Sequence, residues 1–466
     1  MFRTIVTLVT VSFASTANAQ VTRYDLGRKL VALEKAWDDH TGAEARKRAL
    51  PPLKKVMKAF FSGHSDEVAQ LFDEARHALE SDKPVPDAVR WADATKLRFE
   101  KRVFDAAEKS ISVQLFRLYD SSARLPTGLQ LRLKLLNGDG KSITESIAPI
   151  PGLPNLFVLQ VPPNTSGDFH LRGEILENDR VTSSMDYGIS FVPNVEARVK
   201  SLDERADLRK PVTTEDFTLR SHVSLLVRGF AREETNYPVN RLLDETEALA
   251  RLPNDGTYFD KSRPGQFWMT LATAKGPAPI RIQVPKFAAD AKPVPLVIAM
   301  HGAGGSENLF FEGYGHGEIV RLCEKRGWLL VATRTEGIAA APVAAIVDEL
   351  AKRYPVDQKR VFVIGHSMGA AQVMSLARYW PNRWRGLVCL GGGGALAEPA
   401  KVKHIPFFVG VGSEDFALTG ARSLAKSLQE VGAEQVKFIE YPDVEHIMVV
   451  QVALPDIFKW LDELAK

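Results

Sequence analysis

The chain has 466 residues, of which 45% are hydrophobic and 25% are charged. These are the proportions of ordinary globular proteins, so intrinsic disorder over most of the chain is excluded. The 60 Lys and Arg residues nearly balance the 57 Asp and Glu residues and leave a formal net charge of +3. The composition therefore gives no support for a nucleic-acid partner or for binding to an anionic membrane surface.

The length and the cysteine content limit how the chain is built. A chain of 466 residues is long enough for about two to four domains of ordinary size. Its two cysteines, Cys323 and Cys389, permit at most one disulfide. Stability must therefore come from buried apolar surface rather than from a disulfide framework.

Residues 1–19 have the pattern of an export signal. Arg3 supplies positive charge, an apolar stretch occupies 4–14, and Ala17-Asn18-Ala19 is the small-x-small pattern that signal peptidase accepts. We expect cleavage after Ala19 and a secreted or periplasmic protein, with an uncleaved N-terminal helix as the alternative. The apolar stretch is shorter than the about 20 residues that a bilayer-spanning helix needs, so we predict no membrane span.

Residues 20–109 carry apolar side chains at helical spacing, as in Leu26, Leu30 and Leu33. Charged residues fall between the apolar ones, which is typical of helices with one solvated face. We predict a helical N-terminal unit over this range, without a catalytic constellation.

The period of the apolar residues changes near residue 110. Leu129, Leu131, Leu133 and Leu135 alternate with polar residues, which is typical of half-buried strands. The pattern predicts a small β-sandwich-like module over 110–195. A scaffolding role is favoured because the sequence shows no aromatic platform, and binding of a carbohydrate or a protein is the alternative.

The remainder of the chain divides into a helical connector and an α/β domain. Helical periodicity returns over 196–255, and strands then alternate with helices from 256 to 466. Near-continuous apolar strands separated by helices indicate a parallel sheet that is buried on both faces and places its chemistry at the carboxyl ends of its strands. The strand candidates are 296–300, 328–333, 361–364, 387–390, 407–411 and 436–441.

A nucleophile motif directly follows the strand candidate at 361–364. Gly365-His366-Ser367-Met368-Gly369 stands between this strand and a predicted helix, which is the strand, G-x-S-x-G, helix context that a nucleophile elbow requires. The turn is so tight that the residues two before and two after the serine must lack bulk. Ser367 is therefore the candidate nucleophile, and it needs a neighbouring base and donors for an oxyanion.

His446 is the candidate base. It follows the last strand candidate and precedes the final predicted helix. An imidazole at this place can accept the Ser367 proton and return it to the leaving group.

Asp415 is the preferred third member, because it follows the strand candidate at 407–411 and could fix the tautomer of the His446 ring. Glu414, its neighbour, is less favoured. Asp443 lies only three residues from His446 and is less suited to reach behind the ring. Glu398, after the preceding strand, is an alternative acid.

A glycine-rich segment, His301-Gly302-Ala303-Gly304-Gly305, closes the strand candidate at 296–300. We predict that the backbone N–H groups of Ala303 and Met368 form the oxyanion hole. Loss of one such donor typically costs ~3 kcal/mol of transition-state stabilisation. Phe310, Phe311 and Tyr314 follow this loop, and lining of the pocket and a core role are equally favoured for them.

These motifs together resemble the α/β-hydrolase superfamily, in particular its esterase D, feruloyl esterase and polyhydroxybutyrate depolymerase-like branch. The resemblance covers residues from about 265 to 466 and implies an eight-stranded, mostly parallel sheet and a two-step acyl-enzyme mechanism. The motifs that carry it are His301-Gly302-Ala303-Gly304-Gly305, Gly365-His366-Ser367-Met368-Gly369, Gly412-Ser413-Glu414-Asp415 and Asp443-Val444-Glu445-His446.

The sequence thus predicts a secreted serine hydrolase that cleaves small-molecule or polymer-linked carboxylic esters. Ser367 would attack, His446 would shuttle the proton and Asp415 would orient His446. We expect no cofactor, and no metal-ligand spacing is visible. The alternatives are a serine peptidase of the prolyl oligopeptidase type and a catalytically inactive hydrolase-fold binding protein. Ala370, where such peptidases often have a second glycine after the elbow, weakens the peptidase alternative.

Overall fold

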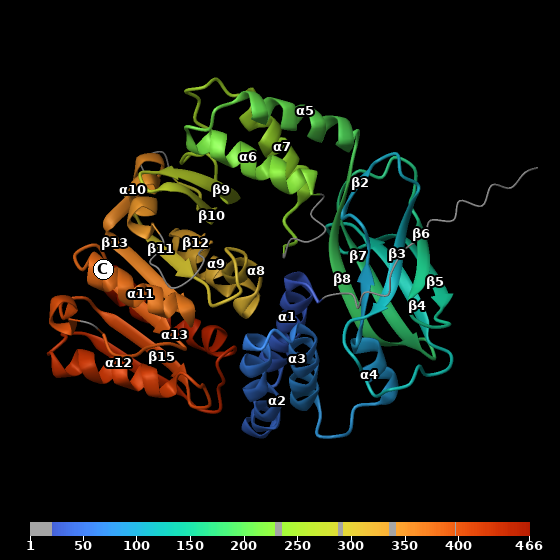
Figure 1. The fold of residues 1–466 in the computed structure, drawn as a ribbon, viewed down its shortest axis with the longest axis horizontal. Helices are drawn as coiled ribbons and strands as arrows, with labels where there is room; N and C mark the ends of the chain where they lie inside the picture. The colour runs from blue at the N-terminus through green and yellow to red at the C-terminus, as the bar shows by residue number, and fades with distance from the viewer. Residues whose placement is uncertain (1–20, 229–234, 288–291, 335–341, 397) are drawn as a thin grey trace, which may run out of the picture.

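The fold is a mixed α/β arrangement in which helices, two small sheets and one large sheet follow one another along the chain (Figure 1). None of the helices in the part described is both long enough and apolar enough to cross a membrane. The predicted export signal lies outside the described residues. The computed structural model describes residues 21–228, 235–287, 292–334, 342–396 and 398–466.

Four helices come first. Thr22 caps the first of them through a capping box: its hydroxyl accepts from the backbone N–H of Asp25 at 3.2 Å, and the Asp25 carboxylate accepts from the N–H of Thr22 at 2.9 Å. Leu33 and Trp37, one turn apart on this helix, are fully buried. The helices are α1 (Arg23–Asp39), α2 (Ala43–Phe61), α3 (Ser65–Glu80) and α4 (Asp87–Asp93).

A β-module follows, and it is built from a three-stranded sheet, β1-β3-β6, and a five-stranded sheet, β2-β8-β7-β4-β5. Inward-facing side chains of both sheets, such as Val113 and Leu133, belong to one apolar cluster. The strands are β1 (Thr95–Arg98), β2 (Val103–Asp105), β3 (Ser110–Arg117), β4 (Gln130–Leu136), β5 (Ser142–Pro149), β6 (Asn155–Gln160), β7 (Gly167–Glu177) and β8 (Arg180–Val192).

The first two strands differ from the prediction, because β1 and β2 lie within the range 20–109 that was assigned to helices. They are four and three residues long, too short to show an alternating pattern. They become strands through long-range pairing, β1 with β3 and β2 with β8.

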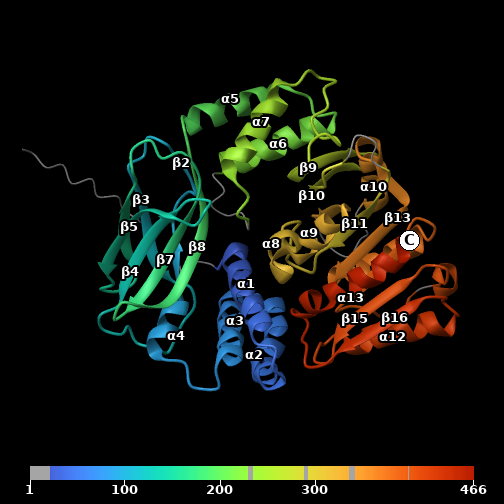
Figure 2. The same ribbon diagram turned by 180° about the vertical axis from the view of Figure 1, so that it is seen from behind.

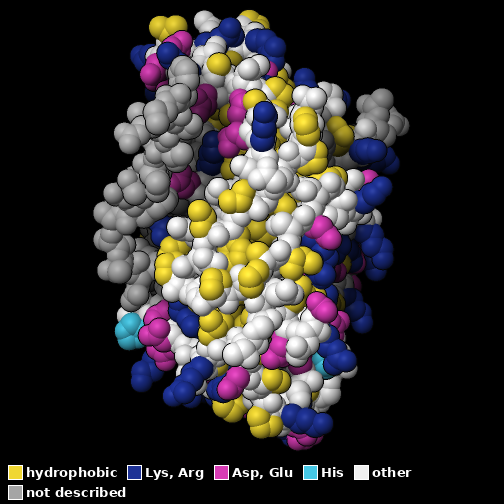
Figure 3. Space-filling view, turned by 90° about the vertical axis from the view of Figure 1, so that its right-hand side faces the viewer, with side chains coloured by type: hydrophobic (Ala, Val, Ile, Leu, Met, Phe, Trp, Pro, Cys, Tyr) yellow, Lys and Arg dark blue, Asp and Glu magenta, His cyan; other side chains and the backbone are white. Residues whose placement is uncertain are grey.

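The outer side of the β-module carries exposed apolar side chains. Ile143 and Ile147 of β5 and Leu156 and Val158 of β6 are 36–56% exposed. Figure 3, which looks onto this side of the molecule, shows hydrophobic side chains gathered near its centre.

Three helices connect the β-module to the large sheet. The hydroxyls of Thr218 and Thr214 accept from the backbone N–H groups of Thr270 and Ala272 at 2.9 and 3.1 Å. The middle helix therefore covers the free edge of the strand β9 (Gly265–Thr273) and satisfies its unpaired donors. The helices are α5 (Val195–Leu208), α6 (Thr214–Val227) and α7 (Val239–Arg251).

The large sheet has eight strands in the order β16-β15-β14-β13-β11-β12-β10-β9. β11 to β16 pair in parallel, whereas β10 pairs antiparallel with β12 and β9 pairs antiparallel with β10. The strands are β9 (Gly265–Thr273), β10 (Gly276–Val284), β11 (Val294–Met300), β12 (Leu329–Thr333), β13 (Val356–His366), β14 (Gly386–Leu390), β15 (Phe407–Gly412) and β16 (Val436–Tyr441).

Helices cover both faces of this sheet, as the continuous apolar strands predict. Along β11, Leu296 and Ile298 join the apolar cluster under α10, α11 and α12, while Val297 and Ala299 join the cluster under α9 and α13. The helices of this part are α8 (Leu309–Glu312), α9 (Tyr314–Arg326), α10 (Val343–Arg353), α11 (Met368–Tyr379), α12 (Leu418–Glu430) and α13 (Val449–Leu464), with a short 3-10 helix at Pro399–Val402.

The N-terminal helices pack against the large sheet's domain. In both ribbon views α1–α3 lie between this domain and the β-module (Figures 1 and 2). The Glu34 carboxylate of α1 accepts from the N–H of Gly315 at 3.1 Å, and the Gln451 amide of α13 donates to the Glu34 carbonyl at 3.1 Å. Apolar residues of α1–α3 share one cluster with α9 and α13.

We expect the stability of this contact to depend on pH, because it buries the Glu34 carboxyl. Burial raises the pKa of its carboxyl from 4.5 to about 8, so the neutral form stabilises the folded state below pH 4.5 and this contribution is lost as the pH rises through about 8. Glutamine cannot ionise, so Glu34→Gln should gain stability over the wild type as the pH rises. The free energy of unfolding of the variant minus that of the wild type should be roughly 2–4 kcal/mol larger at pH 9 than at pH 4. Urea unfolding at the two pH values measures this.

The control for this prediction is Glu44→Gln, because the Glu44 side chain is 84% exposed. It should show the same small effect at both pH values. An equal effect of Glu34→Gln at pH 4 and pH 9 would contradict the prediction.

Candidate active site

The candidate nucleophile occupies a strained turn between β13 and α11. Ser367 has φ 56° and ψ −113°, a backbone conformation that L-residues rarely adopt. A Cβ on Gly365 would lie 2.2 Å from the carbonyl oxygen of Gly369, and a Cβ on Gly369 would lie 2.1 Å from that of Met300. Both positions therefore require glycine, which is the steric reason for the two glycines of the motif.

Asp415 and His446 lie in direct contact. Asp415 is in the loop after β15 and His446 in the loop after β16, and the His446 Nδ1 atom lies 2.9 Å from the Asp415 Oδ1 atom. The backbone N–H of Ala417 also donates to this oxygen at 2.8 Å. Both side chains are almost completely buried, so the carboxylate fixes the ring with Nδ1 protonated.

The backbones of these two loops are held together. The N–H of Glu414 donates to the Val444 carbonyl at 3.0 Å, and the N–H of Asp443 donates to the Ser413 hydroxyl at 3.0 Å. A Cβ on Gly412 would lie 2.0 Å from the Val444 carbonyl oxygen. This close approach places the acid directly behind the histidine.

The other acids that the sequence offered are placed elsewhere. The Glu414 carboxylate forms an ion pair with Lys54 of α2. Glu398 is exposed and pairs with Lys401. Asp443 lies at a left-handed backbone position of the histidine loop. Of the four candidates, Asp415 is the one in hydrogen-bond contact with the His446 ring.

Glu445, next to His446, was not singled out in the sequence. It is 2% exposed, and its carboxylate accepts from the N–H of Ile447 at 2.9 Å. Burial raises the pKa of this carboxyl to about 8, so it stays largely protonated at neutral pH. Asp415 is therefore the neighbour that supplies negative charge to the His446 ring.

Ser367 and His446 lie at the same edge of the sheet. The ring of His366, the residue before the serine, is 4.7 Å from the His446 ring, centroid to centroid. The His446 Nε2 atom is buried and makes no hydrogen bond within the part of the chain that the structure describes. The Ser367 hydroxyl must therefore turn toward this atom before its proton can be transferred. Such a change is common, because catalytic hydrogen bonds often tighten only when substrate is bound.

The two expected oxyanion donors flank the serine. Met368 is the first residue of α11, so its N–H belongs to the first turn of that helix, where donors lack intrahelical partners. Ala303 is exposed and follows Gly302, where a Cβ would lie only 3.3 Å from the Ser367 Cβ. The glycine-rich loop thus touches the nucleophile, and Ala303 is its next residue.

Phe310, Phe311 and Tyr314 are 0%, 6% and 3% exposed. All three belong to the apolar cluster beneath α9 and α13. They therefore contribute to the core, which was one of the two expectations for them.

Tyr314 also has a polar role that the sequence did not indicate. Its hydroxyl donates to the His366 Nδ1 atom at 2.7 Å, and the His366 Nε2 atom donates to the His446 carbonyl at 3.1 Å. Burial, together with the neighbouring His446, holds the pKa of His366 well below its usual range, so this ring stays neutral. Burial raises the pKa of the Tyr314 hydroxyl, and the nearby backbone N–H of Gly302 acts against this rise. The Tyr314 hydroxyl is thus bonded to the elbow at His366, and His366 in turn is bonded to the histidine loop.

Tyr314→Phe should lower the free energy of unfolding by about 1–3 kcal/mol, because it leaves buried polar partners unsatisfied. We expect kcat/KM for an ester to fall about tenfold, since His366, which loses its partner, precedes Ser367 and is bonded to the loop that carries His446. Steady-state kinetics and urea unfolding measure the two effects. Tyr379→Phe, at a tyrosine that is 62% exposed, is the control, and equal behaviour of the two variants would contradict this role.

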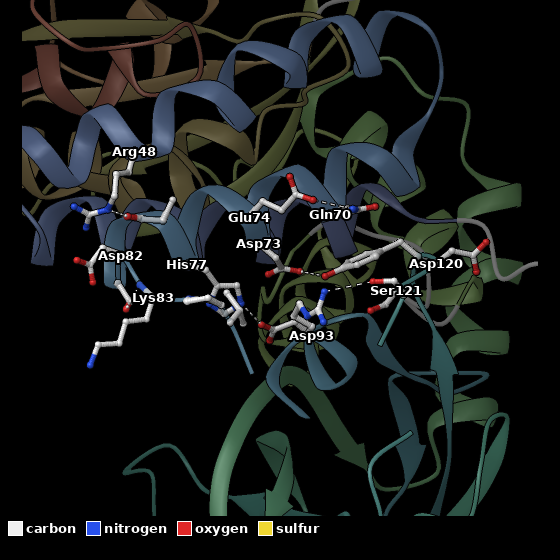
Figure 4. Close-up of a pocket in the computed structure, with 17 residues that line it drawn as sticks. Arg48, Gln70, Asp73, Glu74, His77, Asp82, Lys83, Asp93, Asp120 and Ser121 are labelled. Carbon is white, nitrogen blue, oxygen red and sulfur yellow. Dashed lines mark hydrogen bonds and ion pairs between the residues drawn. The ribbon is translucent and has the colours of Figure 1, made fainter. Parts of the chain in front are cut away.

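A separate pocket lies outside this region (Figure 4). It has a volume of about 500 Å³, and all its lining residues come from 48–122, within the N-terminal helices and the start of the β-module. Several of its polar groups are paired: Tyr119 donates to Asp73 at 2.8 Å, and the His77 Nε2 atom lies 2.7 Å from Asp93. This network ties α3 to α4 and the β-module.

Comparison with known proteins gives matches only among solved structures. No family model and no curated protein matches the chain. A fluorophosphonate-binding serine hydrolase of Staphylococcus aureus matches at 13% identity and a TM-score of 0.36, over 42% of this chain and 98% of that chain. An S-formylglutathione hydrolase from Agrobacterium tumefaciens matches at 18% identity and a TM-score of 0.35, over 45% and 98%.

A thermostable esterase matches at 15% identity and a TM-score of 0.39, over 79% of this chain and 99% of that chain. The identities of these three matches lie between 13% and 18%, and their TM-scores lie between 0.35 and 0.39. Their names are those of esterases and serine hydrolases, the class that the motifs of this sequence resemble.

Proposed function

We propose that this chain is a serine hydrolase that cleaves carboxylic esters, with Ser367 as nucleophile, His446 as base and Asp415 as the acid that orients the base. The observation that carries this proposal is the buried contact of 2.9 Å between Asp415 and His446 at the sheet edge where the strained Ser367 turn also lies. Such a carboxylate, imidazole and hydroxyl arrangement converts a poor nucleophile into an effective one.

In the acylation step the Ser367 Oγ atom attacks the ester carbonyl carbon while its proton moves to the His446 Nε2 atom. Negative charge then develops on the carbonyl oxygen, where the N–H groups of Ala303 and Met368 would stabilise it. The imidazolium that forms is stabilised by Asp415, and it gives its proton to the departing alcohol. Water, activated by the same imidazole, then releases the acid from Ser367.

The proposal includes that the protein acts outside the cytoplasm. The pattern in residues 1–19, a positive charge, an apolar stretch and Ala17-Asn18-Ala19, supports export to the periplasm or the medium. N-terminal sequencing of the protein recovered from the periplasm should start at Gln20. Full-length protein found in the cytoplasm would contradict this part.

The activity is tested by comparing p-nitrophenyl esters with peptide p-nitroanilides, using the wild-type chain and Ser367→Ala. We expect ester hydrolysis by the wild type and a loss of about 10⁴-fold or more in Ser367→Ala, because the attack is removed. Rapid anilide turnover with inert esters would identify a peptidase instead. Absence of all turnover, together with ligand binding, would favour a catalytically inactive binding protein.

A further inference from the structure

A side chain from outside the large sheet's domain reaches the glycine-rich loop. Phe60, near the end of α2, lies so close to Gly304 that a Cβ on this glycine would be 2.4 Å from the Phe60 Cζ atom. Gly304 has φ 74°, in the left-handed region that favours glycine. The residue before it is Ala303, so the Phe60 ring lies one residue from an expected oxyanion donor.

The same helix also touches the loop that carries the acid. Lys54 forms an ion pair with Glu414, the residue before Asp415. Lys54 and Phe60 are six residues apart, which corresponds to about 9 Å along a helix. The second half of α2 therefore runs past the catalytic residues, from the acid loop to the glycine-rich loop.

This position of α2 is held firmly. Phe60 packs against the apolar cluster that α1–α3 share with α9 and α13. Glu34 and Gln451 add the polar contacts between α1 and that domain. The Phe60 ring is thus a fixed wall, in contrast to its neighbour Phe61, which is 63% exposed.

The direction of attack on the ester indicates which part of the substrate lies toward the Phe60 ring. The alcohol oxygen must lie at His446, which protonates it, and the Phe416 ring lies on this histidine with a centroid distance of 4.4 Å. In the proposed mechanism the carbonyl oxygen points to the N–H groups of Ala303 and Met368. The remaining substituent of the carbonyl carbon is the acyl chain, which would then extend along the glycine-rich loop on the side away from Phe416.

We propose that Phe60 is a specificity-determining residue that limits the length of the acyl chain, so that the enzyme takes esters of short carboxylic acids. The inference rests on the proposed function, because it assigns the acyl side from the roles of His446 and Ala303. It also gives the N-terminal helices a part in substrate selection.

The test measures kcat/KM for p-nitrophenyl acetate, butyrate and octanoate in the wild type, Phe60→Ala and the control Phe61→Ala. We expect Phe60→Ala to raise the octanoate-to-acetate ratio about tenfold, because a hydrophobic wall typically discriminates by this order of magnitude. Phe61→Ala should keep the wild-type ratio. Phe60→Leu, which retains most of the buried apolar area, should shift the ratio in the same direction and serves where Phe60→Ala fails to fold.

A second series varies the alcohol, using ethyl, benzyl and octyl acetate. An unchanged acyl ratio in both Phe60 variants, or a change confined to the alcohol series, would overturn the inference while the hydrolysis of p-nitrophenyl acetate upholds the proposed function. Labelling of Ser367 by a fluorophosphonate is run in parallel and reports its reactivity without turnover. A wild type that neither hydrolyses an ester nor is labelled would overturn both.

Discussion

Asp415→Asn is expected to lower kcat for p-nitrophenyl acetate by about 10⁴-fold while the fold is retained. The Asp415 carboxylate accepts from the His446 Nδ1 atom and so keeps the Nε2 lone pair available for the Ser367 proton. An asparagine amide can donate to Nδ1, which moves the ring proton to Nε2 and removes the base. Steady-state kinetics at pH 7 to 8 measure the effect.

The matched control is Glu398→Gln. Glu398 was the alternative acid, and in the structure it is exposed and paired with Lys401. Its substitution should leave kcat within about twofold of the wild type, since the substitution of an exposed side chain usually has little effect on the rest of the protein. An inactive Glu398→Gln beside an active Asp415→Asn would show that the acid is wrongly assigned.

Gly369→Ala is expected to abolish the reactivity of Ser367 and to lower the free energy of unfolding by ~3 kcal/mol, as overpacking at a site without free space does. The added methyl group would stand 2.1 Å from the Met300 carbonyl oxygen and 3.0 Å from that of His301. Met300 is the last residue of β11, whose backbone the sheet holds in place, so the elbow must move instead. Urea unfolding and fluorophosphonate labelling measure the two effects.

Gly27→Ala is the control, because it is the same change at another helical glycine. No atom lies within 4 Å of a Cβ at Gly27 of α1. It should raise the free energy of unfolding by about 0.5–1 kcal/mol, the difference in helix propensity between glycine and alanine. A Gly369→Ala variant that is as stable and reactive as Gly27→Ala would contradict the steric account of the elbow.

The elements that could be predicted from the sequence are those encoded locally. The six strand candidates from 296 to 441 overlap β11 to β16, because parallel strands buried on both faces are continuously apolar. The elbow around Ser367 could be predicted for the same reason: its glycines are required by contacts within a few residues and with the adjacent strand.

The two antiparallel strands of the large sheet were not among the strand candidates, although the resemblance implies a sheet of eight strands. β9 and β10 carry polar residues such as Gln266 and Arg281, which obscure the apolar pattern. Arg281 is nevertheless buried, because it pairs with Glu312 at 2.6 Å and donates to Asn308 at 2.8 Å. Such a strand is stabilised by partners that the local sequence does not contain.

The surroundings of the candidate site were the hardest part to predict. Glu34 and Gln451 are 417 residues apart and touch only because the N-terminal helices dock onto α9 and α13. The contacts of Phe60 and Tyr314 could not be predicted, since aromatic side chains at helical spacing carry no sign of a distant polar or catalytic partner. The sequence offered four acids for His446, and the contact between the two loops distinguishes Asp415 among them.

The most direct test of the central claim is the position of a covalent adduct. The protein is treated with a fluorophosphonate probe, digested, and analysed by peptide mass spectrometry. The account predicts one adduct, on Ser367, formed by the wild type and by Phe61→Ala but lost in Ser367→Ala. An adduct on another residue, or labelling that persists in Ser367→Ala, would contradict it.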